Sequence, residues 1–248
     1  MAAAKRRLDQ LLVDRGLAES RTKAQALILA GLVFTGEQRL ASAGAQVSGE
    51  IPLALRGQDH SWVSRGGLKL ARGLTHFGFE ASGCVALDIG ASTGGFSDVL
   101  LHNGAAKVYA VDVGYGQLAH KIRIDPRVIV LERTNARHLT AGQVSEPATA
   151  IVCDASFIGL RTVLPAALAL AAPRAWLIAL IKPQFEVGRD DIGSGGIVRN
   201  AAARERAVAA VRDWLAQQPG WTVTGMIPSP IVGGGGNLEF LIGARRNE

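Results

Sequence analysis

From residue 85 onward, short apolar runs alternate with stretches that repeat apolar residues at helical spacing. We predict strands at 85–89, 107–112, 127–131, 149–153, 176–181, 221–227 and 238–244, and helices that include 96–101 and 201–218. Such alternation is typical of an α/β fold with a parallel, doubly wound sheet. Two strands follow the last predicted helix, which favours a seven-stranded sheet whose last strand pairs antiparallel.

The beginning of the chain has a different pattern. Leu8, Leu11 and Leu12 share one helical face that ends at Gly16, and Ser20 caps a second predicted helix at 21–30. A short strand and turn follow at 32–36. We therefore expect a small α+β domain at 1–58, a linker at 59–64 and the α/β domain at 65–248.

Composition narrows the class of protein. The 248 residues are 48% hydrophobic with 30 glycines, as in a globular chain. Cys84 and Cys153 lie in apolar runs, which predicts reduced core thiols in a cytoplasmic protein and no metal site. Pro165, Pro173 and Arg174 interrupt the most apolar window, so no membrane span is expected.

The charge is uneven along the chain. Residues 1–75 hold eleven Lys and Arg against six Asp and Glu, whereas residues 76–248 hold sixteen against fifteen. A basic front end favours contact with a phosphate backbone. The first two helices, which are expected to carry Arg6, Arg7, Arg21 and Lys23, and the small strands resemble the RNA-binding domain of the ribosomal protein S-four type. These four residues, together with Arg65, are the candidate RNA-binding residues.

A glycine-rich turn follows the strand at 85–89. Ser92 replaces the second glycine of the dinucleotide pattern G-x-G-x-x-G, so the loop suits a nucleoside ligand without phosphates, such as S-adenosylmethionine. Asp112 ends the next strand about 20 residues later, where an acid hydrogen-bonds ribose hydroxyls. The turn and this acid together favour a nucleoside cofactor.

Two charged residues follow later strands. Asp154 comes after 150–153 and begins a loop that resembles the Asp/Asn-Pro-Pro-aromatic loop of amino-group methyltransferases, without its prolines. Lys182 comes after 177–181. A ribose 2′-hydroxyl needs a base to remove its proton, and a lysine can serve when a neighbouring cation lowers its pKa.

Four motifs together carry a family resemblance. Lys69, Asp154, Lys182 and Glu239 stand where the FtsJ/RrmJ-type 2′-O-methyltransferases have a Lys-Asp-Lys-Glu tetrad. With the N-terminal unit, the chain closely resembles the TlyA family of bacterial rRNA cytidine 2′-O-methyltransferases, also labelled hemolysins. The resemblance implies a Rossmann-like, seven-stranded S-adenosylmethionine-dependent methyltransferase sheet and methylation of cytidine ribose in 16S or 23S rRNA, or both.

The resemblance also implies residue roles. Lys182 would accept the 2′-hydroxyl proton, Lys69 would lower the pKa of Lys182 and orient the ribose, and Asp154 and Glu239 would hold the lysines. The cofactor would be lined by Asp88, Gly90, Ser92, Thr93, Gly94, Phe96, Asp112, Val113 and Asn135. The expected partners are ribosomal RNA and ribosomal subunits. A glycine-rich loop at 186–196 is expected to be mobile over the RNA or cofactor, and glycines at 233–236 to let Glu239 approach the site.

Other functions remain open from the residues alone. The loop after Asp154 fits an RNA base (amino-group) methyltransferase. Cytosine-C5 methyltransferases use a cysteine on this strand as nucleophile, but a buried core thiol is the better interpretation of Cys153. A catalytically silent RNA-binding or ribosome-assembly protein and a membrane-active hemolysin are the alternatives from other classes.

Overall fold

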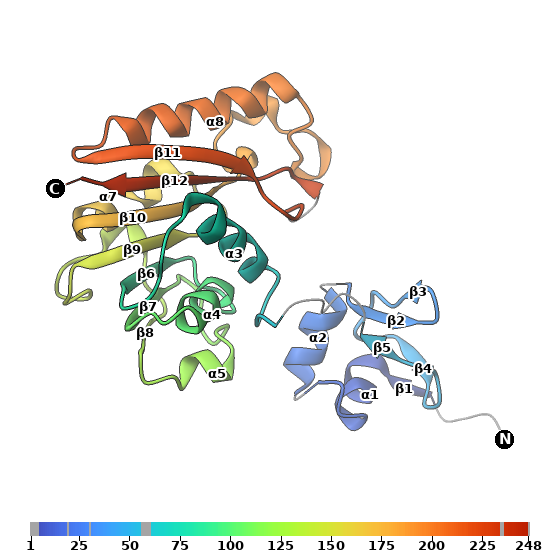
Figure 1. The fold of residues 1–248 in the computed structure, drawn as a ribbon. Coiled ribbons are helices and arrows are strands. Elements are labelled where there is room, and N and C mark those ends of the chain that lie inside the picture. Colours follow the sequence, from blue (N-terminus) through green and yellow to red (C-terminus); the bar gives the residue numbers. More distant parts are fainter. Residues whose placement is uncertain (1–4, 19, 30, 56–60, 234–235, 248) are drawn as a thin grey trace. The chain divides into compact units, whose positions relative to one another are not determined.

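The chain forms two compact units, Met1–Ser61 and Trp62–Glu248 (Figure 1). The computed structural model describes residues 5–18, 20–29, 31–55, 61–233 and 236–247. Positions 59 and 60 of the predicted linker lie outside these residues. Trp62 and Val63 were also assigned to the linker, but they pack against the core of the second unit.

The first unit is built from two helices and two small sheets. Its elements are β1 (Lys5–Arg7), α1 (Leu8–Asp14), α2 (Arg21–Leu29), β2 (Val33–Thr35), β3 (Gln38–Arg39), β4 (Gln46–Ser48) and β5 (Ala54–Leu55). β1 pairs with β4, and β2 pairs with β3 and β5, all antiparallel. The predicted apolar stripes of both helices form the core of this unit, which contains Leu8, Leu12, Ala24, Leu27 and Ile28.

One prediction in this unit is wrong. Arg6 and Arg7 were placed on the first helix, but they belong to strand β1. Arg6 pairs in register with Val47, and Arg7 has an extended backbone (φ −64°, ψ 136°), so the helix begins only at Leu8. The strand pairing overrides the weak helical preference of the two arginines.

The second unit contains a seven-stranded sheet in the order β11-β12-β10-β9-β6-β7-β8. The strands are β6 (Val85–Ile89), β7 (Lys107–Val111), β8 (Val128–Leu131), β9 (Ala148–Cys153), β10 (Ala171–Ile181), β11 (Trp221–Pro228) and β12 (Phe240–Arg246). β6 to β10 pair in parallel, and β12 runs antiparallel to both β10 and β11. The predicted fold class and antiparallel last strand are confirmed.

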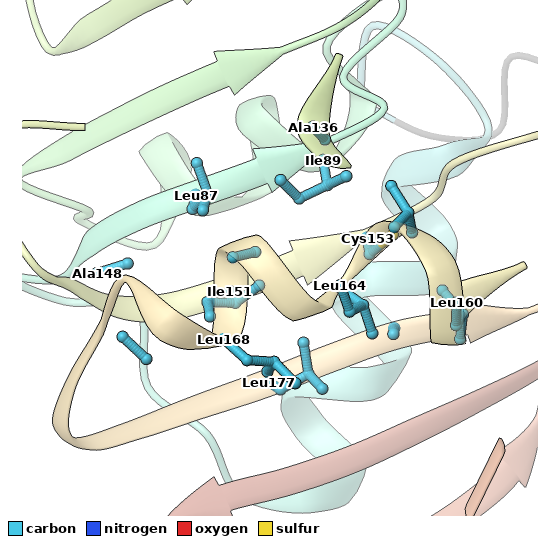
Figure 2. Packing of buried hydrophobic residues seen from close by; sticks show 14 of the residues in the cluster. Leu87, Ile89, Ala136, Ala148, Ile151, Cys153, Leu160, Leu164, Leu168 and Leu177 are labelled. Atoms are coloured by element: carbon cyan, nitrogen blue, oxygen red, sulfur yellow. The ribbon is translucent and has the colours of Figure 1, made fainter. Parts of the chain in front are cut away.

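Helices cover both faces of this sheet. One core cluster joins it to α3 (Gly66–Phe77), α4 (Gly95–His102) and α5 (His120–Arg123), and the other joins it to α6 (Leu160–Val163), α7 (Pro165–Ala169) and α8 (Ala201–Ala216). Figure 2 shows the second cluster, in which Leu87 and Ile151 of the sheet pack near Leu164 and Leu168. Short 3₁₀ turns complete the unit: η1 (Ala136–His138), η2 (Pro183–Phe185), η3 (Arg189–Asp191) and η4 (Ser194–Gly196).

The topology fixes where polar loops converge. The chain moves outward from β6 through β7 to β8, then returns to β9 on the other side of β6. Ligands of open α/β sheets bind beyond the carboxyl ends of the strands at such a reversal. The loops after β6, β7, β9 and β10 meet at this edge, and they carry most of the predicted site residues.

Candidate active site

Four buried or half-buried charges form one connected chain at this edge. Lys69 Nζ lies 2.7 Å from Glu239 Oε2 and 3.8 Å from Asp154 Oδ2, and Lys182 Nζ lies 2.7 Å from Asp154 Oδ1. Lys69 comes from α3, Asp154 follows β9, Lys182 follows β10, and Glu239 directly precedes β12. The structure thus brings together the four predicted catalytic residues from segments up to 170 positions apart.

Lys182 is also fixed by hydrogen bonds. Its ammonium donates to the carbonyl oxygen of Asp154 (3.0 Å) and to Ser156 Oγ (2.8 Å). Burial of the side chain makes these partners necessary, since an unpaired buried ammonium is costly. Ser156 is not among the residues predicted from the sequence, although its position two residues after Asp154 in the same loop is a signal that could have identified it.

Glu239 approaches Lys69 because the neighbouring backbone leaves room. A Cβ on Gly233 would lie 2.1 Å from Glu239 Oε1, so a side chain there would displace the carboxylate. Residues 234 and 235 of the predicted glycine run lie outside the described residues. The strand was predicted to begin at 238, but β12 begins at Phe240, so Glu239 lies in the loop before it.

The buried Asn237 holds the segment next to Glu239. Its Oδ1 accepts a hydrogen bond from the Val198 amide (3.1 Å), and its Nδ2 donates to the Gly196 carbonyl (2.9 Å). The glycine-rich loop expected to be mobile is therefore hydrogen-bonded to the loop that carries Glu239. Asn237 lacked a sequence signal of its own.

The turn after β6 has the backbone geometry that a close-fitting ligand requires. Gly90 and Gly94 have φ of 79° and 90°, in the left-handed region that favours glycine. A Cβ on Gly90 would lie 2.8 Å from the Cα of Ala155, which follows Asp154. The turn after β6 and the loop that carries Asp154 therefore pack directly on each other.

Asp112 is fixed at the end of β7 by backbone donors. The Ser92 amide donates to Asp112 Oδ2 (2.8 Å), and the Gly114 amide donates to Oδ1 (2.7 Å). Each carboxylate oxygen keeps a second lone pair that could accept a ribose hydroxyl. The geometry thus fits a nucleoside whose ribose faces Asp112.

The remaining predicted cofactor residues separate into two groups. Ser92, Val113 and Asn135 are exposed and Thr93 is half-buried, with Val113 at 71% exposure. Asn135 Oδ1 accepts from the Arg137 amide (3.1 Å) as the cap of η1. Asp88 and Phe96 are buried beneath the turn instead, so their placement suits support of the loop and not direct contact with a ligand.

Burial has an electrostatic consequence for Asp88. Its Oδ2 accepts a hydrogen bond from Ser97 Oγ (2.6 Å). Burial nevertheless raises the pKa of the Asp88 carboxyl to about 7, and the nearby Asp154 carboxylate contributes to the increase. The charge of Asp88 therefore changes near neutral pH.

Cys153 is a core residue, as the sequence analysis preferred. Its side chain is completely buried in β9, and burial raises the pKa of the thiol to about 12. A thiol in this state is a poor nucleophile, which opposes cytosine-C5 chemistry. Among the described residues, no group of three or more His, Cys, Asp or Glu side chains is arranged to hold a metal ion.

An exposed aromatic side chain lies beside the charged residues. Phe157 is 90% exposed, has φ of 65°, and its ring centroid lies 5.3 Å from that of Phe185. A left-handed backbone is uncommon for a bulky residue and is concentrated at functional sites. Each ring lies three residues after a member of the Asp154–Lys182 pair, so the loops after β9 and β10 contact each other through these rings as well.

In the first unit, one buried acid organises two of the predicted RNA-binding arginines. Asp9 accepts hydrogen bonds from Arg7 (2.9 and 3.0 Å), Arg21 (3.1 Å) and Gln25 (2.9 Å). The hydrogen bond from Arg7 is the largest of the effects that hold the pKa of Asp9 far below its usual range. Both guanidinium groups remain about half exposed, so they keep donors available to a partner.

The other predicted RNA-binding residues are distributed over both units. Arg6 pairs with Asp14 through Nη1 at 2.8 Å, and Lys23 is half-buried on α2. Arg65 is exposed in the second unit, at the residue that precedes α3.

Comparison with known proteins identifies both units. Residues 62–246 match the FtsJ-like methyltransferase family, and residues 6–50 match the S4 domain. The chain is 46% identical over 244 residues to the 16S/23S rRNA (cytidine-2′-O)-methyltransferase TlyA of Mycobacterium tuberculosis, covering 98% of this chain and 91% of that protein. It is 38% identical to Hemolysin A of Brachyspira hyodysenteriae, covering 95% and 98%.

A solved structure agrees with these matches. A protein from Streptococcus thermophilus, provisionally named a hemolysin, aligns with a TM-score of 0.75 and 39% identity over 100% of this chain and 90% of its own. Within the described residues, no helix is long and apolar enough to cross a membrane. With an S4 domain followed by an FtsJ-like methyltransferase domain, and with this identity over nearly its full length, the chain belongs to the TlyA family of methyltransferases.

Proposed function

We propose that this protein methylates the 2′-hydroxyl of cytidine ribose in ribosomal RNA, with S-adenosylmethionine as methyl donor. The observation that carries the proposal is the connected chain Glu239–Lys69–Asp154–Lys182, with two ion pairs at 2.7 Å and one at 3.8 Å. The relative from Mycobacterium tuberculosis is named for cytidine 2′-O-methylation of 16S and 23S rRNA, which supports the same base and substrate class here.

Each of the four residues has a distinct role in this proposal. Lys182, once it has lost a proton and is a neutral amine, receives the proton of the 2′-hydroxyl, while Lys69, as the ammonium, orients the ribose oxygen and stabilises the charge that develops on it. Asp154 lies between the two lysines and fixes their separation. Glu239 compensates the charge of Lys69, which would otherwise be buried without a close partner. Ser156 restricts the rotation of the Lys182 ammonium through its hydrogen bond.

S-adenosylmethionine, when bound, supplies an electrophilic methyl group. The turn from Gly90 to Gly94 lies against the Asp112 carboxylate and the Ala155 backbone, and it would line the nucleoside part of the cofactor. Asp112 would accept hydrogen bonds from the ribose hydroxyls, and Val113 and Asn135 would contact the adenine. Asp88 and Phe96 would maintain the shape of the loop from below.

Two regions would hold the RNA. Arg7 and Arg21, both fixed by Asp9, would contact phosphates of a folded rRNA segment through their exposed donors. Phe157 would stack on the base of the target nucleotide, because an exposed aromatic ring beside a ribose-modifying site offers a surface for any nucleobase. Phosphate contacts then determine position on the RNA, and the ring helps present the ribose to Lys182.

The decisive experiment measures transfer of labelled methyl groups to ribosomal subunits from a strain that lacks the activity, followed by mass analysis of nucleosides. The wild-type protein should yield 2′-O-methylcytidine, and Lys182→Ala should lose the product while RNA binding is retained. Methyl groups on the base would instead support the amino-group methyltransferase. Binding without incorporation into either subunit would leave a non-catalytic RNA-binding protein.

A further inference from the structure

Glu186 is a buried acid that the proposed reaction does not yet use. It follows η2 in the loop after β10, and its side chain is only 3% exposed. Its Oε1 accepts a hydrogen bond of 2.6 Å from the Leu160 amide, and Oε2 lies 3.7 Å from Arg161 Nε. A carboxylate is buried in this way only when partners offset the loss of hydration.

These contacts connect the two loops that carry the proposed catalytic pair. Leu160 begins α6 directly after the loop that holds Asp154, Ser156 and Phe157, whereas Glu186 lies four residues after Lys182. The packing leaves no spare space, because a Cβ on Gly159 would lie 3.0 Å from both Glu186 Oε2 and the Phe185 carbonyl. The Glu186 side chain thus connects the loop after β10 to the start of α6, several residues beyond the ends of β9 and β10.

The two loops are therefore joined by polar contacts at two places, with the Phe157–Phe185 ring contact between them. Next to the strands, Lys182 bonds to Asp154 and Ser156. Further from the strand ends, Glu186 bonds to Leu160. An attachment at the strand ends alone would let each loop pivot there, whereas the second polar attachment helps define the separation of Lys182 Nζ from the Asp154 carboxylate.

We propose that Glu186 is a positioning residue, which fixes Lys182 against Asp154 and Ser156 by holding the loop after β10 to the start of α6. The proposal rests on the proposed 2′-O-methyl transfer. Misplacement of a reacting group by about 1 Å can lower the rate of the chemical step by about a hundredfold. The cofactor residues follow β6, β7 and β8, so loss of this attachment should leave cofactor affinity intact.

The test compares Glu186→Ala and Glu186→Gln with Asp190→Ala, which removes an exposed acid four residues further along the chain. Glutamine keeps a carbonyl oxygen for the Leu160 amide, whereas alanine removes the acceptor. We expect kcat to fall about 10- to 100-fold in Glu186→Ala and less than threefold in Glu186→Gln and Asp190→Ala, because only the first variant loses the loop attachment. KM for the cofactor should change less than twofold in all three.

A readout that does not depend on turnover separates this proposal from the proposed function. Hydrogen exchange should be faster at the Leu160 amide in Glu186→Ala than in Glu186→Gln and the wild type. Three results would each overturn the positioning role. The first is unchanged exchange at the Leu160 amide in Glu186→Ala, and the second is a kcat of Glu186→Ala equal to that of the wild type. The third is a lower kcat together with a higher KM for the cofactor, neither of which Glu186→Gln restores. If exchange at the Leu160 amide is faster in Glu186→Ala as expected, but the wild-type protein transfers no methyl groups, the proposed function is overturned and the positioning role is not.

Discussion

The Lys69–Glu239 pair illustrates that a buried charged side chain needs an oppositely charged partner. Both side chains are buried, and they contact each other at 2.7 Å. Removal of one partner leaves the other charge buried with inadequate compensation, at a cost of about 3–5 kcal/mol. Replacement of both by apolar residues of similar size avoids this cost.

We therefore expect Glu239→Ala to lower the free energy of unfolding by about 3 kcal/mol. The double variant Lys69→Met/Glu239→Leu should recover much of that loss but remain inactive in methyl transfer. Urea denaturation of the single and double variants measures both values. A Glu239→Ala protein as stable as the wild type would show that water or a rearranged Asp154 already compensates Lys69.

Asp88 makes stability depend on pH in a direction opposite to most carboxyl groups. Its pKa in the folded protein is about 7, above the ordinary value, so the folded state retains a proton that the unfolded state releases. The contribution of Asp88 to stability is therefore complete below about pH 4 and is lost as the pH rises to 7. Asparagine mimics the protonated acid and avoids this loss.

Asp88→Asn should consequently gain stability relative to the wild type as the pH rises from 5 to 8, by about 2–3 kcal/mol. Urea denaturation at several pH values checks this, with the exposed Asp190→Asn as control. If the difference between wild type and Asp88→Asn stays constant over this range, the buried carboxyl does not titrate as described.

At the residue scale, the sequence alone reveals only part of the site. Asp154 and Lys182 were found because each follows an apolar strand, and Asp112 because of its distance from the glycine turn. Lys69 and Glu239 were identified only through family resemblance, since a lysine on a helix and an acid between Leu238 and Phe240 usually face solvent. The position of Ser156 two residues after Asp154 was a usable signal, whereas the contact of Glu186 with Leu160 follows from no spacing rule.

At the scale of elements, α3 depends on a close contact with the segment that precedes it. A Cβ on Gly67 would lie 2.4 Å from Cγ and 2.6 Å from Cβ of Trp62. The base of an indole side chain cannot move without moving its backbone. Gly73 on the same helix would instead place a Cβ 3.2 Å from Cγ2 of Ile178, which a small side-chain shift relieves.

Gly67→Ala should therefore lower stability by about 1–3 kcal/mol through overpacking, despite the higher helix propensity of alanine. Gly73→Ala should change stability by less than about 1 kcal/mol, because propensity and mild crowding offset each other. Thermal denaturation of the two variants provides the comparison. Equal melting temperatures would mean that Trp62 is displaced from α3 without cost.

The elements themselves were largely predictable because apolar runs coincide with buried strands. The strand at 85–89 has the predicted bounds, and those at 107–111 and 128–131 differ by one residue at one end. The errors occur where tertiary pairing decides. β1 forms because β4 lies beside it, and β12 begins at Phe240 because the preceding residues bond to Gly233 and Gly196.

At the scale of the whole molecule, the excess positive charge is concentrated toward the beginning of the chain and continues across the boundary between the two units. Residues 1–75 hold eleven Lys and Arg against six Asp and Glu, whereas the first unit alone, 1–61, holds eight against six and residues 62–248 hold nineteen against fifteen. Binding to phosphates releases counterions, so affinity falls with salt in proportion to the number of phosphate contacts. Long-range attraction to RNA should therefore originate mainly from the basic front of the chain.

Substitution of Arg21 tests directly whether the basic front of the chain supplies this attraction to RNA. Its half-exposed guanidinium is fixed 3.1 Å from Asp9, so Arg21→Ala should remove about one phosphate contact and reduce the slope of log affinity against log salt by about 0.9. Arg212→Ala is the matched control, since Arg212 is half exposed and paired with Asp213 on α8, outside the basic front of the chain. Binding of the full chain to ribosomal subunits at several salt concentrations measures both slopes.

An unchanged slope for Arg21→Ala, or an equal decrease for Arg212→Ala, would contradict the assignment of RNA attraction to the basic front of the chain. A decrease confined to Arg21→Ala, with normal cofactor binding, would support it.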